Sequence, residues 1–244
     1  MLTKIYDFLL SRKFTLRLQS RLVRKLNPIA IFGEWWINPM GGQARRIKKV
    51  IELCDEFQPS LVIETGTFVG STSPLLANLF SSPVITIELN PRLASRNKMM
   101  FEYLYPGLNI SQVTGNSDTE LTRILEQRDL NEKIFAYLDA HWFDYLPTTN
   151  ELKALVEWGG DFIALVDDFK NDLHPGYGWD QYRSGTFIGK HLLPKGAGLR
   201  LFVPSLDPEK EGLARRGTAY IFSNNVFSKF PNLNLNQLIE LEFE

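Results

Sequence analysis

The chain has 244 residues, of which 44% are hydrophobic and 23% charged, and this composition predicts a globular protein with one full hydrophobic core. Its net charge of −1 gives no overall attraction to nucleic acid, and no apolar stretch approaches the roughly 20 residues of a transmembrane helix. Cys54 is the single cysteine, which excludes a disulfide framework and a thiolate zinc cluster and favours a reducing, cytoplasmic location.

Residues 1–42 differ from the rest of the chain in their charge. Seven lysines and arginines against one aspartate give residues 1–26 a net charge of +6. Leu18, Leu22 and Leu26 recur at helical spacing, so we expect a basic amphipathic helix followed by a loop. Two roles stay open for this helix: packing on the domain or on a second copy in a homodimer, and peripheral contact with a membrane surface.

From residue 43 onward, short apolar runs alternate with amphipathic segments. Strands are expected over residues 61–64, 84–88, 108–113, 134–139 and 162–166, and helices over residues 43–57, 71–79, 91–103, 118–127 and 148–158. Ser117 or Asp118 is expected to cap the helix that follows it. Residues 199–203 and 218–222 read as two strands of a hairpin. The pattern predicts a single α/β domain, residues 43–244, with a doubly wound, mostly parallel sheet and a C-terminal antiparallel hairpin.

The turn after the first strand is the most informative motif. The strand ends at Glu64, Thr65-Gly66-Thr67-Phe68-Val69-Gly70 follows, and the second strand ends at Glu88, 22 residues beyond Gly66. Backbone N–H groups in such a turn can approach a nucleotide-like ligand, while the second acid can hold ribose hydroxyls. Phe68 breaks the G-x-G-x-x-G spacing of dinucleotide enzymes, and a P-loop lysine is missing. We expect a small-molecule site here, the structural alternative being a tight turn that serves no ligand.

Three aspartates lie at the ends of later strands: Asp139 after the fourth, and Asp167 with Asp168 after the fifth. The carboxyl ends of parallel strands meet at one edge of a sheet, so these side chains should lie close together. Clustered carboxylates repel one another unless they are hydrogen-bonded, protonated or neutralised by a cation. Their oxygen atoms suit Mg²⁺, and the alternative role is the capping of loops after the strands.

Five features follow one another along the chain: Ile63-Glu-Thr-Gly-Thr-Phe-Val-Gly70, Ile87-Glu88, Gly115-Asn-Ser117, Leu138-Asp139 and the closing hairpin. This ordered set resembles the class I S-adenosylmethionine-dependent methyltransferases over about residues 43–223. The resemblance implies S-adenosylmethionine as cofactor and a seven-stranded sheet with an antiparallel last strand. It also implies a cofactor site in which Glu64, Gly66 and Gly70 shape the methionine end, Ser71 or Thr72 contacts the carboxylate, Glu88 holds the ribose, and Asn116 and Ser117 lie beside the adenine.

A second, finer resemblance concerns the aspartates. Leu138-Asp-Ala-His-Trp-Phe-Asp-Tyr-Leu-Pro-Thr148, read with Val166-Asp-Asp-Phe169, resembles the metal-dependent sugar O-methyltransferases of the macrocin type. It implies that Asp139, Asp167 and Asp168 hold a divalent metal such as Mg²⁺. His141 would stand where that family has a catalytic acidic base, and a histidine can also accept a proton. Contact with substrate or with a strand end is the other role open to His141.

The segment 172–185 mixes glycine and proline with Tyr177, Trp179 and Tyr182. Such a loop can close over an acceptor and stack on a sugar or aromatic ring, or its aromatic residues can anchor a long connection to the core.

Together these features predict methyl transfer from S-adenosylmethionine to an oxygen of a small sugar-like or phenolic acceptor, assisted by a metal. A nicotinamide-dependent oxidoreductase is one alternative, because Glu88 would serve the ribose of that cofactor equally well. A non-catalytic protein that keeps the cofactor-binding fold is the other.

Overall fold

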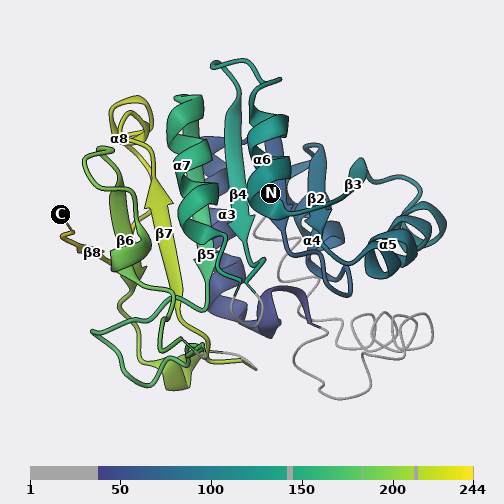
Figure 1. Ribbon diagram of the computed structural model, residues 1–244. Helices are drawn as coiled ribbons and strands as arrows, with labels where there is room; N and C mark the ends of the chain where they lie inside the picture. Colours follow the sequence, from purple (N-terminus) through teal and green to yellow (C-terminus); the bar gives the residue numbers. More distant parts are fainter. Residues whose placement is uncertain (1–37, 142–144, 183, 212–213, 244) are drawn as a thin grey trace.

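The computed structural model describes residues 38–141, 145–182, 184–211 and 214–243 (Figure 1). Its strands are β1 (Leu61–Thr65), β2 (Val84–Glu88), β3 (Ile110–Thr114), β4 (Lys133–Leu138), β5 (Asp161–Asp167), β6 (Arg200–Pro204), β7 (Thr218–Phe222) and β8 (Leu238–Leu241). Its helices are α3 (Ala44–Phe57), α4 (Thr72–Phe80), α5 (Pro91–Leu104), α6 (Ser117–Leu125), α7 (Thr148–Trp158) and α8 (Val226–Lys229), with 3-10 turns η3 (Pro39–Gly42), η4 (Lys190–Leu192) and η5 (Pro208–Lys210). The basic helix expected within residues 1–26 lies outside the described residues.

The local sequence of α3 explains both its formation and its end. Val50, Leu53 and Phe57 recur every three or four residues, and all three are fully buried. The helix stops at Gln58, which adopts a left-handed backbone conformation with φ 50°, and Pro59 follows.

The caps of α5 and α6 differ in how well the sequence anticipates them. α5 begins at Pro91, and the Asn90 side chain accepts a hydrogen bond from the backbone N of Arg92 at 3.0 Å. The predicted cap of α6 is wrong, because Asn116 is the extended N-cap residue and Ser117 already lies in the helix. Asp118 is also inside the first turn, where its carboxylate accepts a bond from the Tyr145 hydroxyl instead.

The strands form one sheet in the order β3-β2-β1-β4-β5-β7-β6-β8. β3, β2, β1, β4 and β5 are mutually parallel, while β7 pairs antiparallel with both β5 and β6, so its arrow points the opposite way in Figure 1. The doubly wound sheet and the antiparallel β6–β7 pair are confirmed. The strand number predicted from the resemblance is wrong, since β8 adds an eighth strand, with Leu241 opposite Leu201 on β6.

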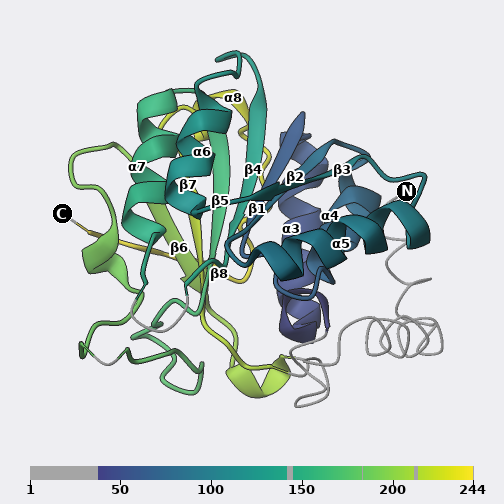
Figure 2. The same cartoon turned by 45° about the vertical axis from the view of Figure 1, so that its right-hand side comes forward.

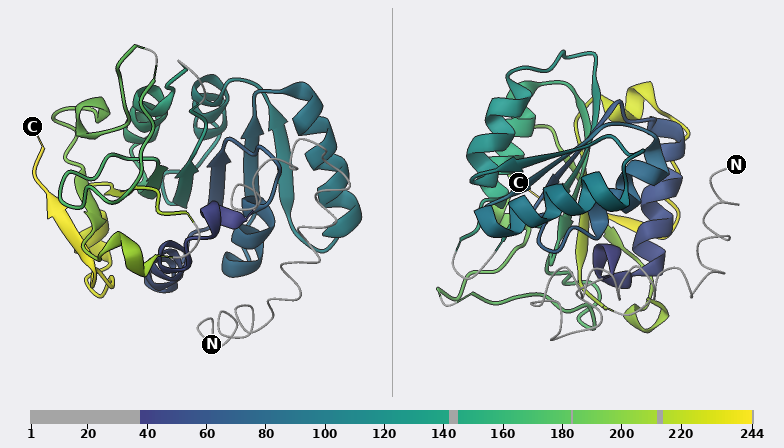
Figure 3. Two further views of the ribbon diagram at one scale, coloured as in Figure 1. Left: turned by 90° about the horizontal axis from the view of Figure 1, so that it is seen from below. Right: turned by 90° about the vertical axis from the view of Figure 1, so that its right-hand side faces the viewer.

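Helices cover both faces of the sheet, as Figures 1 and 2 show. Val62 packs into the core beneath α3 and α4, while Ile63, the next residue of β1, packs into the core beneath α6 and α7. This alternation follows from the pleat of the strand, which turns successive side chains to opposite faces. Figure 3 (right) shows the resulting three layers nearly edge-on. Among the described helices, none is long and apolar enough to cross a membrane.

Parallel strand direction brings the carboxyl ends of β1, β2, β4 and β5 to one edge of the sheet, the lower edge in Figure 1. This edge carries the residues that the sequence analysis singled out.

Candidate functional site

Glu64, the penultimate residue of β1, is a buried carboxylate. Its Oε2 atom accepts hydrogen bonds from the hydroxyl groups of Ser73 on α4 and of Thr86 on β2, the latter at 2.6 Å. Burial raises the pKa of Glu64 to about 7, against the opposing effect of the two hydroxyl groups. Glu64 thus joins β1, β2 and α4 beneath the glycine turn.

The glycines of the turn are required by close contacts. Gly66 has φ 81°, and a Cβ atom there would lie 2.1 Å from the backbone oxygen of Asp139. Gly70 has φ 74°, and its Cβ would lie 2.7 Å from the Met100 side chain. The turn therefore lies directly against the end of β4 on one side and against α5 on the other.

Glu88 ends β2 with its carboxylate next to the same turn. Its Oε2 accepts a hydrogen bond from the backbone N of Phe68 at 2.8 Å, and its Oε1 accepts one from the backbone N of Asn90 at 2.9 Å. Burial raises the pKa of Glu88, while these two backbone donors act to lower it. Each oxygen retains acceptor capacity for a further donor such as a ribose hydroxyl.

The remaining predicted cofactor residues surround this turn at the starts of α4 and α6. Ser71 is the N-cap residue of α4, and Thr72 follows it with its hydroxyl accepting from the backbone N of Met40 at 3.1 Å. Asn116 is exposed at the N-cap of α6, while Ser117 is buried. The structure brings both helix starts to the same sheet edge as Glu88.

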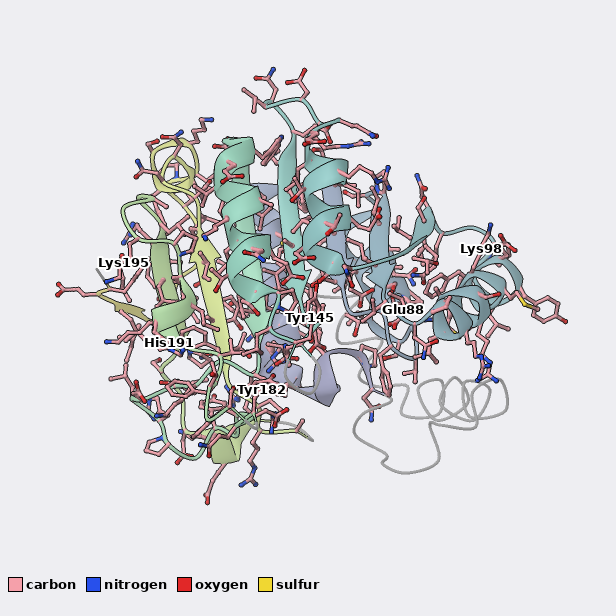
Figure 4. All side chains as sticks on the ribbon, in the orientation of Figure 1. Glu88, Lys98, Tyr145, Tyr182, His191 and Lys195 are labelled. Atoms are coloured by element: carbon pink, nitrogen blue, oxygen red, sulfur yellow. The ribbon has the colours of Figure 1, made fainter. Side chains whose placement is uncertain are left out.

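A group of four carboxylates, Asp139, Asp167, Asp168 and Asp180, lies beside the turn; we call it the aspartate cluster. Asp167 is the last residue of β5 and Asp168 follows it, Asp139 follows β4, and Asp180 comes from the long connection between β5 and η4. Figure 4 shows the setting: Glu88, Tyr145 and Tyr182, from separate segments, lie along this edge of the sheet.

Asp167 is held entirely by protein groups. Its Oδ2 forms an ion pair of 2.7 Å with Arg46 of α3 and accepts a hydrogen bond from the Tyr137 hydroxyl at 2.6 Å. Its Oδ1 accepts from the backbone N of Asp168 at 2.8 Å. Burial acts against the charge of Arg46, yet Asp167 keeps the pKa of the guanidinium above its usual value.

Asp168 lies between a histidine and an arginine. Its Oδ2 is 3.1 Å from Nε2 of His141, and its Oδ1 accepts a bond from Nε of Arg216. Burial acts to raise the pKa of Asp168, but these two partners hold it well below its usual range. Its φ of 55° places its backbone in the left-handed region immediately after β5.

Asp139 is less constrained than its neighbours. Its side chain is 36% exposed, its Oδ2 accepts a bond of 3.3 Å from the Tyr137 hydroxyl, and its Oδ1 is 3.6 Å from Nε2 of His141. The partly buried setting and the nearby Asp167 charge raise the pKa of Asp139 well above its usual range. This carboxylate therefore has the least neutralisation by cations in the cluster.

The neighbouring carboxylates change the pKa of His141. Burial acts to lower its pKa, but the bond to Asp168 and the charge of Asp139 raise the pKa to about 9. At neutral pH the imidazole therefore carries two protons and donates to Asp168. It becomes a proton acceptor only as the pH approaches 9.

The structure also shows groups that the sequence analysis missed: Arg46, Arg216, Tyr137 and Asp180. One signal for Arg46 was available, since it occupies the apolar stripe of α3 together with Val50, Leu53 and Phe57. A charged residue on a buried stripe requires a buried partner.

The aromatic residues of the 172–185 segment divide between the two roles considered for them. Tyr177 is buried and its hydroxyl donates to Glu211 at 3.2 Å, so it anchors the connection. Tyr182 packs edge-on against His141, with ring centroids 6.3 Å apart. Its hydroxyl oxygen is buried without a hydrogen-bond partner in the part of the chain that the structure describes. Burial and the charges of Asp168 and Asp180 raise its pKa.

Two surface cavities lie elsewhere, around His191. One, of about 320 Å³, is lined by Lys170, Asp172, Phe187 and residues 189–191. The other, of about 790 Å³, extends from Lys190 to the β6 and β8 edge. Neither includes a member of the aspartate cluster or of the glycine turn, so we do not assign the predicted chemistry to them.

Comparison with known proteins supports the same fold. The chain is 29% identical to catechol O-methyltransferase of Mus musculus over 119 residues, which cover 48% of this chain and 43% of that protein. It is 26% identical to the Bos taurus enzyme over 158 residues, which cover 64% of this chain and 56% of that protein. The chain thus spans about half the length of the curated relatives it matches. No family model matches it.

Among solved structures, an O-methyltransferase from Bacillus cereus in complex with SAH is similar over 91% of this chain and 100% of that one. The TM-score is 0.53 and the sequence identity 14%, so the likeness concerns the fold. The resemblance to the class I S-adenosylmethionine-dependent methyltransferases is confirmed by these relatives, while the finer resemblance to the macrocin type stays a prediction.

Replacing Gly66 with alanine should destabilise the protein by about 2–4 kcal/mol, because the left-handed backbone is costly for alanine and the new Cβ would collide with the Asp139 carbonyl. Gly185→Ala is the matched control: its φ is 79°, but among the described residues no atom beyond its chain neighbours lies within 4 Å of the added Cβ. Urea unfolding should show a loss of only about 1 kcal/mol for the control. Equal losses in both variants would contradict the close contact at Gly66.

The raised pKa of Glu64 should make stability depend on pH. The folded state binds the proton more tightly than the unfolded chain, whose value is near 4.5, so the stabilisation is complete below pH 4.5 and is lost as pH rises through about 7. Glu64→Gln should therefore gain roughly 2 kcal/mol relative to the natural protein between pH 5 and pH 8. Denaturant unfolding at both pH values measures this, with exposed Glu102→Gln as the control. A constant difference across the range would refute it.

Proposed function

We propose that this protein transfers a methyl group from S-adenosylmethionine to an oxygen of a small sugar-like or phenolic acceptor, with the assistance of a divalent metal. The observation that carries the proposal is the placement of the glycine turn and Glu88 beside the aspartate cluster at one edge of the sheet. A cofactor site and a group of proton-accepting and cation-binding side chains thus lie next to each other. The catechol O-methyltransferases to which the chain is similar give independent support.

In this proposal the cofactor lies across the ends of β1 and β2. Glu88 accepts hydrogen bonds from the ribose hydroxyls, and Glu64, Gly66 and Gly70 shape the methionine end. Ser71 or Thr72, at the start of α4, meets the methionine carboxylate, a position that a helix N-terminus favours. Asn116 and Ser117, at the start of α6, lie beside the adenine.

The sheet order argues against the nicotinamide alternative. Dinucleotide enzymes with the doubly wound fold have the strand order 3-2-1-4-5-6 in a mostly parallel sheet. Here the antiparallel β7 lies between β5 and β6. Position 68 is also occupied by phenylalanine, with φ 47°, where the dinucleotide motif requires glycine.

The donor atoms of the aspartate cluster fit a divalent cation. Four carboxylates face two arginines. Burial and the Asp167 charge raise the pKa of Asp139, while the bond to Asp168 and the charge of Asp139 raise the pKa of His141. Asp139 and Asp168 would hold the ion, and a carboxylate oxygen of Asp180 and a His141 nitrogen lie within 4.8 Å of Asp168 and of each other. Asp167, predicted as a third ligand, is bonded by Arg46, Tyr137 and a backbone N–H, so we propose that it orients its neighbours. A bound Mg²⁺ would supply Lewis acidity that lowers the pKa of the acceptor hydroxyl.

The chain's own residues supply orientation and proton transfer. Methyl transfer from a sulfonium needs the nucleophile, the methyl carbon and the sulfur in line, and such alignment can contribute about 7 kcal/mol or more. His141 accepts the acceptor's proton in its neutral form only, which the surrounding carboxylates disfavour below pH 9. Tyr182 packs edge-on against the imidazole, and both side chains are buried. The predicted cytoplasmic location, homodimer and peripheral membrane contact stay predictions.

Glu88→Ala should weaken the binding of S-adenosylhomocysteine by at least about tenfold, because charged hydrogen bonds to the ribose are lost. Calorimetric titration of the purified chain measures the change, and the exposed Glu102→Gln variant on α5 should bind like the natural protein. Failure of the natural protein to bind S-adenosylhomocysteine would overturn the proposed cofactor.

Asp139→Asn should separate cofactor binding from chemistry. We expect S-adenosylhomocysteine affinity to stay within about threefold while methyl transfer to catechol or a sugar acceptor falls by on the order of a hundredfold. Labelled methyl transfer, with Mg²⁺ and with chelator, measures the second quantity. Full activity in chelator would remove the metal from the proposal and leave the methyl transfer intact.

A further inference from the structure

Arg216 joins two members of the aspartate cluster that come from different segments. Its Nε donates to Oδ1 of Asp168 after β5, and its NH2 group donates to Oδ1 of Asp180 at 2.5 Å. Asp180 is 48% exposed and has no other ion pair among the described residues. The Arg216 guanidinium therefore joins Asp180, in the connection after β5, to Asp168 at the end of the strand.

The backbone of Arg216 is fixed, while its side chain alone reaches into the cluster. The Gln43 side chain bonds the backbone of Arg216 twice, donating to its O at 3.0 Å and accepting from its N at 2.9 Å. Arg46 also donates to the same carbonyl oxygen at 3.0 Å. The guanidinium can thus leave the two carboxylates by side-chain rotation, without any change in the fold.

The carboxylates that Arg216 bridges are also candidate metal ligands. A His141 nitrogen and one oxygen each of Asp168 and Asp180 lie within 4.8 Å of one another, and Arg216 occupies two of these three residues. A separate observation points to a missing partner at this place. The hydroxyl of Tyr182, a residue 8% exposed beside His141, is buried without a hydrogen-bond partner in the described part of the chain.

We propose that Arg216 is a resident cation which occupies Asp168 and Asp180 and is exchanged for the divalent metal ion when that ion binds. The exchange adds Asp180 to the metal ligands and releases the guanidinium towards solvent. The Tyr182 hydroxyl, which has no partner among the described residues, would then be available to hydrogen-bond a group held at this site. This inference rests on the metal clause of the proposed function.

If Arg216 and the metal ion compete for the same carboxylates, replacing either member of the Arg216–Asp180 ion pair should change metal affinity, but in opposite directions. Arg216→Gln removes the competitor and leaves Asp168 and Asp180 unpaired, so metal affinity should rise by on the order of tenfold. Asp180→Asn removes a ligand and leaves Arg216 on Asp168, so metal affinity should fall by a similar factor. A purely structural ion pair would give both variants the same small change.

Electron paramagnetic resonance of free Mn²⁺, titrated with the full chain, measures these affinities without any acceptor. Arg200→Gln is the matched control, because Arg200 also uses two nitrogens in an ion pair, with Glu240 at 2.6 Å, at the far edge of the sheet. The control should bind Mn²⁺ like the natural protein. Arg216→Lys guards against a fold defect: a lysine keeps the charge but cannot bridge both acids, so its affinity should lie between those of the natural protein and Arg216→Gln.

Tighter binding in Arg216→Gln with weaker binding in Asp180→Asn supports the exchange. Weaker or unchanged binding in Arg216→Gln overturns it and makes Arg216 a positioning residue. Absence of Mn²⁺ binding in both the natural protein and Arg216→Gln also overturns it. Parallel titration with S-adenosylhomocysteine shows in that case whether the cofactor part of the proposed function survives.

Discussion

The ion pair between Arg46 and Asp167 is the interaction on which the functional end of this protein depends. Arg46 is fully buried on α3, and besides Asp167 it bonds the backbone oxygens of Arg216 and Gly217, the two residues that precede β7. It therefore ties α3, β5 and β7 together at one point. Removing one member of such a buried pair leaves an uncompensated charge, which costs about 3–5 kcal/mol.

This ion pair also determines which aspartates are already neutralised by the protein and which are not. Tyr137 and Arg46 satisfy Asp167, so its charge is already balanced inside the protein. Asp139 and Asp168 face outward from that balanced position and share the surplus negative charge with His141. In the proposed function, cations, protons and acceptor groups exchange at the outer side of the cluster while this fixed pair holds α3, β5 and the start of β7 in place.

Local patterns predicted most of the fold, because the strands and helices of this chain follow periodicities that lie within single segments. The β1 and β2 strands, Pro91 at the start of α5 and the β6–β7 pair needed no tertiary information. β8 is different: residues 238–241 become a strand only because β6 presents a free edge. The aspartates could be predicted as a group from their positions after parallel strands. Their partners could not, since Arg216 lies in an irregular connection where no periodicity indicates its direction.

The negative charge of the aspartate cluster couples the protonation of His141 to the position of the Arg216 side chain. The proton on His141 and the side chain of Arg216 are both attracted by Asp168, and any further cation at that carboxylate must compete with both. By linkage, a cation that binds there weakens the hold of the cluster on the imidazole proton, and loss of that proton strengthens cation binding by the same factor. Protonation of the proposed base and occupancy of the proposed cation site are therefore two aspects of one charge balance. The ion pair between Arg46 and Asp167 neutralises one of the four carboxylates, and it therefore determines how much negative charge remains at the other three.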